Sequence, residues 1–319
     1  MNNSILELYV KTKKDWDKHA SVRVSNKSYD LNLNDIDLND DLNWHLPSYS
    51  PILDHNDLKS LSDDQKRFVM GTQLLEFVEK TTIFEIEQVN NVANNLALGK
   101  YDFDIPNLLK VDAFKIYTDE GFHALFSKKM SDDIKKYYKI EDDITPYLKN
   151  FFLKLKKIGS KFDQKYLYLS NLSSTIVSES MIVHDISNEM KSIVYEPIRE
   201  MFRDHMIDEA YHANYFGTLF KVIWSQLSKK EKEIMSSNLC DSILLLSKPR
   251  VDIFYYSLSK LGFKENQISK IISDVYDNNK EIKQNILKRK SSPVLKLLEN
   301  AGVFNFTFAN EKFKANGLI

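Results

Sequence analysis

The sequence predicts an all-α protein in which long helices are joined by few connections. Only 8 of its 319 residues are glycine and 7 are proline, and these two residue types commonly mark turns and strand ends. Long stretches instead repeat their apolar residues with the 3.6-residue period of a helix. Ser62-Asp-Asp-Gln65 and Ser228-Lys-Lys-Glu231 are both capping boxes, which indicate the first turn of a helix.

Charge and cysteine content narrow the class of protein. Lys and Arg number 44 against 45 Asp and Glu, so the net charge of −1 favours neither nucleic acid nor an anionic membrane. No apolar run reaches the roughly eighteen residues of a membrane span, and the N-terminus lacks the layout of a signal peptide. A single cysteine, Cys240, cannot form an intrachain disulfide and fits a reducing compartment. We expect a soluble, cytoplasmic protein.

The chain is expected to form an N-terminal strap, residues 1–60, packed on one large domain, residues 61–319. Residues 32–43 are rich in Asn and Asp, and Trp44, Pro47 and Pro51 follow them. This composition indicates an ordered but extended segment. One helix is expected in the strap, near residues 4–18.

Four long amphipathic helices form the expected centre of the large domain. The first begins after Ser62 and runs to about residue 98. The second begins near Pro106 and the fourth near Pro197, because proline suits the first turn of a helix. The expected ranges are 62–98, 106–129, 161–190 and 197–227.

Shorter elements are expected around these four helices. Residues 131–157 indicate one or two amphipathic helices with a junction near Pro146. A helix begins after Ser228, and another over 249–261 ends at Gly262, a natural C-terminal cap. Residues 265–300 predict one or two charged helices interrupted near Pro293. The alternating tail after Val303 predicts a short extended segment.

Each of the four long helices carries a glutamate on its apolar stripe. A buried, unpaired carboxylate is costly, so each of these residues needs a partner such as a metal ion. On the first helix Glu79 lies close to the same stripe and competes with Glu85 for this role. The four stripe residues are Glu85, Glu120, Glu179 and Glu209.

Two of the glutamates are followed three residues later by a histidine, in Glu120-x-x-His123 and Glu209-x-x-His212. Residues three and four apart share one helix face, and iron or manganese prefers such a mixture of carboxylate and imidazole ligands. One Glu from each of two helices with Glu-x-x-His from each of two others is the ligand set of ferritin-like di-metal proteins. We expect a ferritin-like four-helix bundle with additional flanking helices and two iron ions, manganese being the alternative.

Three further residues lie beside these ligands. His205 precedes Glu209 by one helical turn and can add a third imidazole; the alternative is a core histidine that does not touch metal. Asp119 and Asp208 each directly precede a ligand glutamate. We expect each aspartate to orient a ligating imidazole on the neighbouring helix.

Other histidines and tyrosines are expected to have no ligand role. Tyr117, Tyr211 and Tyr215 lie close to the ligands in sequence, and core packing is expected for each, with redox participation as the alternative. The histidines expected to stay away from the metal are His19, His45, His55 and His184.

This constellation resembles the di-iron arylamine N-oxygenases, the family typified by the p-aminobenzoate N-oxygenase of aureothin biosynthesis. The resemblance covers residues 60–227 and rests on His205-x3-Glu209-x2-His212, Glu120-x2-His123 and the single Glu85 and Glu179. The additional histidine, His205, is its most specific element. It separates this family from relatives that resemble methane monooxygenase, ribonucleotide reductase or the desaturases.

The resemblance implies an enzyme with seven protein ligands to two irons. Its implied reaction is the O2-dependent oxidation of an amine to a hydroxylamine in a biosynthetic pathway, with nitroso and nitro products as further oxidation levels. It also implies a homodimer and an external electron donor, either a reductase or a ferredoxin-like protein. The alternatives are a di-iron hydroxylase or desaturase that acts on carbon, a ferritin-like protein that handles iron or peroxide, and a bundle whose carboxylates are only structural.

Overall fold

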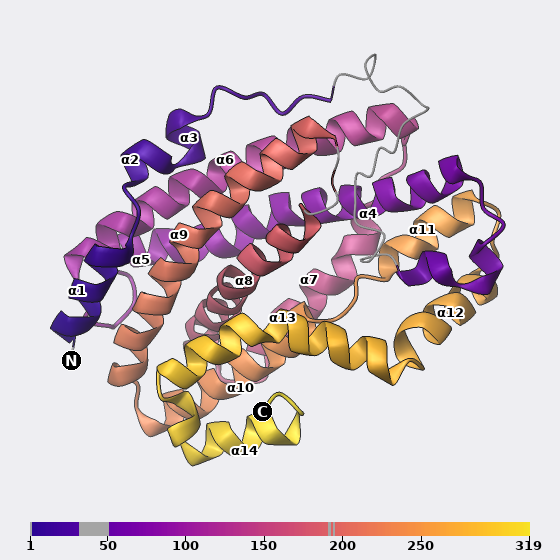
Figure 1. The fold of residues 1–319 in the computed structure, drawn as a ribbon. Coiled ribbons are helices and arrows are strands. Elements are labelled where there is room, and N and C mark those ends of the chain that lie inside the picture. Colours follow the sequence, from indigo (N-terminus) through magenta and orange to yellow (C-terminus); the bar gives the residue numbers. More distant parts are fainter. Residues whose placement is uncertain (1, 32–50, 191–192, 194) are drawn as a thin grey trace.

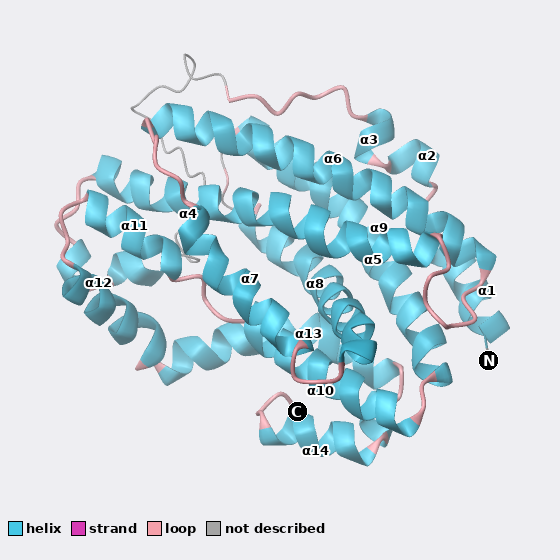
Figure 2. Ribbon diagram, turned by 180° about the vertical axis from the view of Figure 1, so that it is seen from behind, coloured by secondary structure: helices cyan, strands magenta, loops and turns pink. Residues whose placement is uncertain are grey.

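The computed structural model describes residues 2–31, 51–190, 193 and 195–319. Within these ranges all regular secondary structure is helical and no strand is present (Figure 1, Figure 2). The predicted all-α class is therefore confirmed. Among the described helices, none combines the length and the apolar character that crossing a bilayer requires.

Four long helical segments form the centre of the molecule. The first is α4, which continues through one turn of π-helix into α5; this segment packs against α6, while α8 packs against α9 and α6 also contacts α9. Figure 1 shows these segments running alongside one another through the middle of the molecule. The bounds are Asp63–Phe84 for α4, Glu85–Val89 for the π-turn, Asn90–Ala97 for α5, Asn107–Tyr138 for α6, Leu167–Glu189 for α8 and Glu196–Gln226 for α9.

Local sequence signals explain where several helices begin. At the start of α4 the Ser62 side chain accepts a hydrogen bond from the backbone N–H of Gln65, whose side chain accepts one from the Ser62 N–H. The same exchange joins Ser228 and Glu231 at the start of α10, Lys229–Leu246. Pro197 occupies the first turn of α9. Both predicted capping boxes are confirmed.

The bundle interior consists of two apolar clusters with a polar layer between them. Ile116 of α6 and Ile176 of α8 belong to one cluster, whereas Val78 of α4, Phe126 of α6 and Phe202 of α9 belong to the other. Burial of one such side chain contributes about 1.5–3 kcal/mol, so the two clusters hold the four segments together. The polar layer contributes no such energy, because buried charges are costly unless they are paired.

Shorter helices cover the bundle, as the sequence predicts. Both α10 and α13 pack on α8, α11 packs on α4, α7 contacts α8, α10 and α11, and α14 lies on α10. Their bounds are Thr145–Gly159 for α7, Asp252–Lys260 for α11, Glu265–Ile272 for α12, Lys280–Asn300 for α13 and Thr307–Ala315 for α14. Past the end of α11, Gly262 adopts a φ of +91°, as expected for a glycine that follows a helix.

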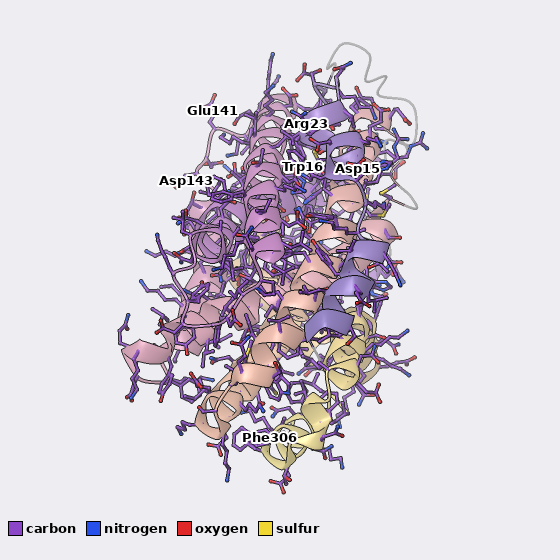
Figure 3. All side chains as sticks on the ribbon, turned by 90° about the vertical axis from the view of Figure 1, so that its left-hand side faces the viewer. Asp15, Trp16, Arg23, Glu141, Asp143 and Phe306 are labelled. Atoms are coloured by element: carbon purple, nitrogen blue, oxygen red, sulfur yellow. The ribbon has the colours of Figure 1, made fainter. Side chains whose placement is uncertain are left out.

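The N-terminal segment lies along α6 and α9 (Figure 3). It contains α1, Asn2–Thr12, then α2, Trp16–His19, and α3, Ser21–Val24. The sequence predicted one helix near residues 4–18, and the structure divides that range between α1 and α2. Beyond them, short 3-10 turns span Pro51–Asp54 and Asn56–Leu58. The extended strap expected around Trp44 and Pro47 lies outside the described residues.

The second long helix extends further than predicted. The sequence suggested an end near Lys129 and a new helix after Ser131, but α6 continues to Tyr138 and ends where Lys139 adopts left-handed backbone angles. Ser131 does not cap a helix; its buried hydroxyl donates a hydrogen bond to Glu79 of α4 at 2.5 Å. This tertiary contact lies where the sequence predicted a break between two helices.

Two predictions for the C-terminal region are wrong. Pro293 lies inside α13, and the break comes earlier, at a π-turn over residues 273–277 and at Asn279, which caps α13. Val294 and Leu298 are buried against the core, and this packing offsets the backbone hydrogen bond that proline removes. The tail after Val303 is not extended: it forms a 3-10 turn and then α14, which Phe313 anchors in the core.

A pair of helix glycines tests the packing of α4 against α6. A Cβ on Gly71 would lie 2.2 Å from Cε2 of Tyr138, whereas one on Gly121 would meet nothing within 4 Å. We expect Gly71→Ala to lower the free energy of unfolding by about 1–3 kcal/mol, the usual cost of overpacking. Gly121→Ala should raise it by up to about 1 kcal/mol, since alanine favours a helix. Thermal and urea unfolding measure both, and equal stability of the two variants would contradict this packing.

Candidate metal centre

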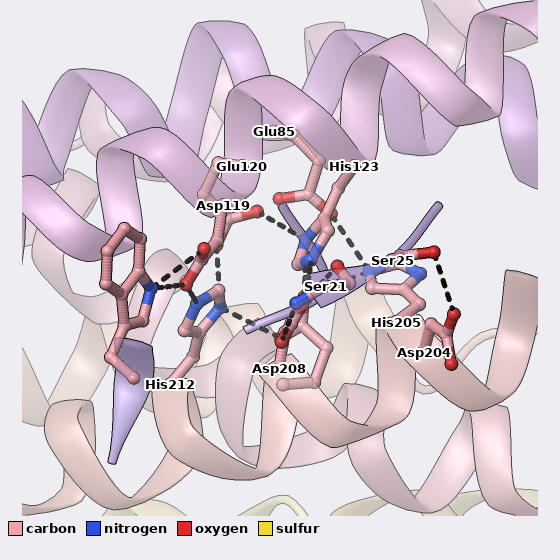
Figure 4. Close-up of polar contacts among 12 residues, drawn as sticks. Ser21, Ser25, Glu85, Asp119, Glu120, His123, Asp204, His205, Asp208 and His212 are labelled. Atoms are coloured by element: carbon pink, nitrogen blue, oxygen red, sulfur yellow. Dashed lines mark hydrogen bonds and ion pairs between the residues drawn. The ribbon is translucent and has the colours of Figure 1, made fainter. Parts of the chain in front are cut away.

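All seven predicted ligand side chains meet in the polar layer of the bundle. Figure 4 shows five of them, Glu85, Glu120, His123, His205 and His212. Each of them is buried. Their nitrogen and oxygen atoms form three overlapping groups in which every atom lies within 4.8 Å of the others. The groups are Glu85, His123, His205 and Glu209; Glu120, His123, Glu209 and His212; and Glu85, Glu120 and Glu179.

Glu85 stands at a local irregularity of the backbone. It begins the π-turn between α4 and α5, and within this turn Glu85 and Val89 are buried while Ile86 is 49% exposed. Such turns insert one residue into a helix and are frequent at functional sites. The apolar period of the sequence identified Glu85 as a stripe residue, but it did not predict the π-turn.

His205 and His123 contact the first part of the cluster, which contains Glu85 and Oε1 of Glu209. Nε2 of His205 lies 2.9 Å from Oε1 of Glu209 and 3.9 Å from Oε1 of Glu85. Nδ1 of His123 lies 3.3 Å from the same Glu209 oxygen. His205 is thus not a core histidine apart from the cluster; it contacts two of the carboxylates.

His212 contacts the second part of the cluster, which contains Glu179, Oε1 of Glu120 and Oε2 of Glu209. Its Nδ1 atom lies 3.0 Å from Oε1 of Glu120 and 3.6 Å from both Oε2 of Glu179 and Oε2 of Glu209. Glu209 therefore directs one oxygen to each part of the cluster. Glu120 does the same, because its Oε2 atom lies 3.3 Å from Nδ1 of His123. Each of these two glutamates therefore contacts histidines in both parts of the cluster.

Several atoms of the cluster have no hydrogen-bond partner among the described residues. Nδ1 of His212 and Oε1 of Glu120 are 3.0 Å apart, yet their geometry is not that of a hydrogen bond, so both face a common space. An unsatisfied buried polar atom costs about 1–3 kcal/mol, and a charged one costs more. A cation in that space would satisfy the whole set, which also includes Glu85 Oε2, Glu179 Oε2 and Glu209 Oε2.

The buried carboxylates of the cluster also lack enough nearby positive charge for all of them to ionise. Burial, followed by the charge of Glu120, raises the pKa of Glu85; burial, followed by the charge of Glu209, raises that of Glu179. Burial is also the largest effect on Glu120 and acts in the same direction, but the charge of His212 and the hydrogen bonds with Glu85 and His123 together outweigh it and lower the pKa of Glu120 to about 2. Four carboxylates this close do not all ionise without a compensating charge. The donor set therefore suits one or more metal cations.

An aspartate from the facing helix holds each of two histidines. Nε2–H of His123 on α6 donates to Oδ2 of Asp208 on α9 at 3.1 Å, and Nε2–H of His212 on α9 donates to Oδ2 of Asp119 on α6 at 3.2 Å. These are the cross-helix contacts that the sequence predicted. They fix both rings with Nδ1 directed to the cluster, as partners of metal-binding histidines commonly do.

The N-terminal segment holds the two aspartates in turn, which the sequence did not predict. The indole Nε1–H of Trp16 donates to both carboxylate oxygens of Asp119, at 2.9 and 2.8 Å. Asp208 accepts hydrogen bonds from the backbone N–H of Ser21, at 3.1 and 3.2 Å, and from the Ser21 hydroxyl. No local pattern marks these contacts, because they join residues more than a hundred positions apart.

Glu79, the competitor of Glu85, lies outside the cluster. Its carboxylate forms an ion pair with Lys135 and accepts the hydrogen bond from Ser131. Glu79 is therefore already satisfied, whereas Oε2 of Glu85 has no hydrogen-bond partner among the described residues.

Most of the other expectations for histidine and tyrosine agree with the structure. His19, His55 and His184 are absent from the groups of potential ligands, and His45 lies outside the described residues. Tyr211 and Tyr215 are buried, as predicted. Tyr117 is 47% exposed, so core packing was the wrong prediction for it, because it faces away from the bundle.

A cavity of about 380 Å³ adjoins the cluster on the side of α4 and α8, where Glu85 and Glu179 line it. Its other lining residues come from α4, α7, α8, α10, α11, α13 and the connections between these helices; among the described residues, none from α6 or α9 takes part. Apolar and cationic side chains share the wall: Phe77, Phe84, Phe151, Met181, Lys80, Arg250 and Lys290.

Comparison with known families agrees with this geometry. The family model described as p-aminobenzoate N-oxygenase AurF matches residues 15–302. The chain belongs to this family. The match extends well beyond the four ligand-bearing segments and includes most of the flanking helices. A search of curated proteins finds no match. Membership of the p-aminobenzoate N-oxygenase family implies an oxygenase, and the buried cluster of histidines and glutamates is a potential metal site.

Matched variants of α4 test this assignment. We expect Glu85→Ala to reduce the iron bound per chain after anaerobic reconstitution, because it removes a carboxylate that two of the ligand groups share. Glu79→Ala should leave the iron content unchanged, since the Glu79 carboxylate pairs with Lys135 instead. Elemental analysis of desalted protein measures both variants. Equal losses of iron would show that the cluster is not the metal site.

Proposed function

We propose that the protein is an O2-dependent di-iron N-oxygenase that oxidises an amine to a hydroxylamine. The observation that carries this proposal is the position of His205. Its imidazole joins the six-ligand set at 2.9 Å from Glu209, and it is the residue that distinguishes an N-oxygenase site from related di-iron sites in the resemblance described above. The family match supports the same conclusion.

The ligand groups suggest which residues hold each ion. We assign one ion to Glu85, His123 and His205 and the other to Glu179 and His212, with Glu120 and Glu209 between them. All the ligands are oxygen or imidazole nitrogen, a set that iron and manganese favour. When bound, the two metal ions would supply the redox chemistry that activates O2.

The other residues of the site would position the ligands and the substrate and exclude water. Asp119 and Asp208 keep the rings of His212 and His123 in one orientation. The two apolar clusters keep bulk water away from the polar layer. The cavity beside Glu85 and Glu179 is the place where an amine nitrogen would approach the site, and holding it there reduces the entropic part of the barrier.

The cavity wall also indicates the chemical class of the amine. Arg250 pairs with Glu76 at 3.0 Å, and Lys290 pairs with Asp185 at 2.8 Å. Lys80 also lines the cavity, but among the described residues no carboxylate forms an ion pair with it; its Nζ atom lies 5.1 Å from the centre of the Phe151 ring. A shielded ammonium without a carboxylate partner suits an anionic group on a ligand.

The pKa of Lys80 agrees with this role. Burial, with the charge of Arg250 as the next cause, lowers the pKa of Lys80 to about 7. An anion beside the ammonium would stabilise its charged form. We infer that the substrate carries an amine at one end and an anionic group at the other, as p-aminobenzoate does.

Mass spectrometry tests the proposed reaction. The iron-loaded protein is reduced, exposed to 18O2 and incubated separately with p-aminobenzoate and with anilines that carry other substituents. We expect one 18O atom to be added at nitrogen, giving a hydroxylamine, with nitroso and nitro compounds as further products. Oxygen incorporated at carbon, or full O2 consumption with every amine unchanged, would contradict N-oxygenation.

A second variant tests the anion site. We expect Lys80→Met to raise the KM for an aniline carboxylate by roughly ten- to a hundredfold, because a hydrogen bond to a charged group contributes about 1.5–3 kcal/mol. The KM for the aniline without a carboxylate should stay unchanged. Lys154→Met is the matched control, since Lys154 lines the same cavity but is exposed. Equal effects on both substrates would show that Lys80 does not bind the anion.

A further inference from the structure

We propose that Trp16 and Asp119 connect the protein surface to the metal centre electronically, and that electrons from an external donor protein enter by this route. The proposal rests on the proposed function, because an O2-dependent N-oxygenase needs two external electrons in each turnover. It assigns a role to a residue of the N-terminal segment that does not touch the ligand cluster itself.

The route consists of consecutive hydrogen bonds. Nε1–H of Trp16 donates to both oxygens of Asp119, at 2.9 and 2.8 Å. Asp119 Oδ2 in turn accepts from Nε2–H of His212 at 3.2 Å, and Figure 4 shows these two side chains facing each other. Nδ1 of the same imidazole faces the carboxylate cluster. Electron transfer through protein weakens steeply across gaps and is carried better by bonds and hydrogen bonds. Hydrogen bonds join the Trp16 indole to Asp119 and Asp119 to His212, so the route has no gap between the indole and a proposed metal ligand.

Trp16 also lies between the protein surface and the buried Asp119. Asp119 is 1% exposed and cannot meet a partner protein, whereas Trp16 is half-buried on the short helix α2. Figure 3 shows Trp16 on the face that α2, α6 and α9 form, with Asp15 and Arg23 beside it. The guanidinium of Arg23 lies 5.6 Å from the centre of the indole. The indole therefore links an accessible face to a buried carboxylate.

Within the described part of the chain, the opposite histidine, His123, has no hydrogen-bonded connection to an aromatic ring. Asp208 holds His123, but its own partner is Ser21, which offers a hydroxyl and a backbone N–H instead of an aromatic ring. If the donor only had to hold the aspartate in place, a serine hydroxyl and an indole N–H would serve equally well. On the His123 side the aromatic neighbour Phe126 makes a ring contact, with centroids 5.4 Å apart, and no hydrogen bond. Among the described residues, the hydrogen-bonded aromatic ring is therefore on the Asp119 side, which makes the two sides of the cluster chemically unequal.

A second aromatic route is less direct. Tyr9 donates to Asp112 at 2.8 Å and to Tyr211 at 3.4 Å, and the Tyr211 ring lies 6.0 Å from the ring of His212. Tyr9 is 1% exposed, so this pair does not reach the surface. The connection from Tyr211 to His212 is a ring contact and not a hydrogen bond.

The charge around Trp16 identifies the kind of partner. Residues 11–27 carry six cations and two carboxylates. Four of the cations form ion pairs, Lys13 with Asp112, Lys18 with Asp15, Arg23 with Asp17 and Lys27 with Glu200 and Asp204. Among the described residues, Lys11 and Lys14 form no ion pair and remain available to a partner. This surface suits an acidic one-electron carrier, such as a reduced iron–sulfur protein, because opposite charges accelerate docking. The cations are Lys11, Lys13, Lys14, Lys18, Arg23 and Lys27.

The transfer itself is a simple redox step. The iron–sulfur cluster of the donor protein would lose one electron to the metal ions held by the seven ligands, and a second donor molecule would supply the second electron. No bond forms or breaks in the connecting residues. The hydrogen bonds from the Trp16 indole to Asp119 and from His212 to Asp119 keep their protons, so neither aspartate nor indole is consumed.

Two reductants of different size test the route. Iron-loaded ferric protein without amine is mixed anaerobically with a reduced [2Fe–2S] ferredoxin, and separately with dithionite, and the loss of ferric absorbance is followed by stopped flow. The ferredoxin cannot enter the cavity beside Glu85, whereas dithionite can. We expect Trp16→Phe to slow reduction by ferredoxin at least tenfold and to leave reduction by dithionite unchanged.

The control is Trp224→Phe, the same substitution at a ring that packs on Phe220 in the apolar core. It should leave both rates at the wild-type value. An undiminished ferredoxin rate in Trp16→Phe would overturn the route, and equal slowing by both reductants would show that Trp16 only supports the structure of the site. Absence of ferric absorbance in the wild-type protein would instead contradict the proposed function, so the two failures are distinguishable.

Discussion

The structure depends on one electrostatic constraint: four carboxylates and three imidazoles are buried in a single layer of a helical bundle. Burial and mutual repulsion raise the pKa of Glu85 and Glu179, so this layer lacks positive charge. It cannot stabilise the bundle by itself. The apolar clusters above and below it hold the helices together, and the layer is thereby kept available for cations.

The same constraint explains why the site extends beyond its ligands. An imidazole whose outer nitrogen were free could rotate, and the cluster would lose its geometry. Asp119 and Asp208 prevent this by crossing between α6 and α9. Because these aspartates are themselves buried, they need donors, which Trp16 and Ser21 provide. The short helices of the N-terminal segment thus belong to the site as much as the bundle does.

The ligands could be predicted from sequence because they obey a local rule. Glu120 and His123 share a face of one helix, and each ligand glutamate lies on an apolar stripe. Both features can be recognised in the sequence from the 3.6-residue period of a helix. The aspartate contacts followed from the same periodicity. The π-turn at Glu85, the partners Trp16 and Ser21, and the use of Ser131 by Glu79 could not be predicted. Each depends on tertiary contacts, and in such cases packing overrides the local signal, as it does at Pro293.

The cluster has two chemically different sides, one that lines the cavity and one that the N-terminal segment holds. Glu85, in the π-turn that follows α4, and Glu179 of α8 line the cavity, so the substrate would approach oxygen ligands. His123 and His212, from α6 and α9, are backed by aspartates and the N-terminal segment, and none of the described residues of α6 or α9 lines that cavity. In the proposed reaction an amine would approach through this cavity and electrons would arrive through the N-terminal segment, so the two would not compete for one opening.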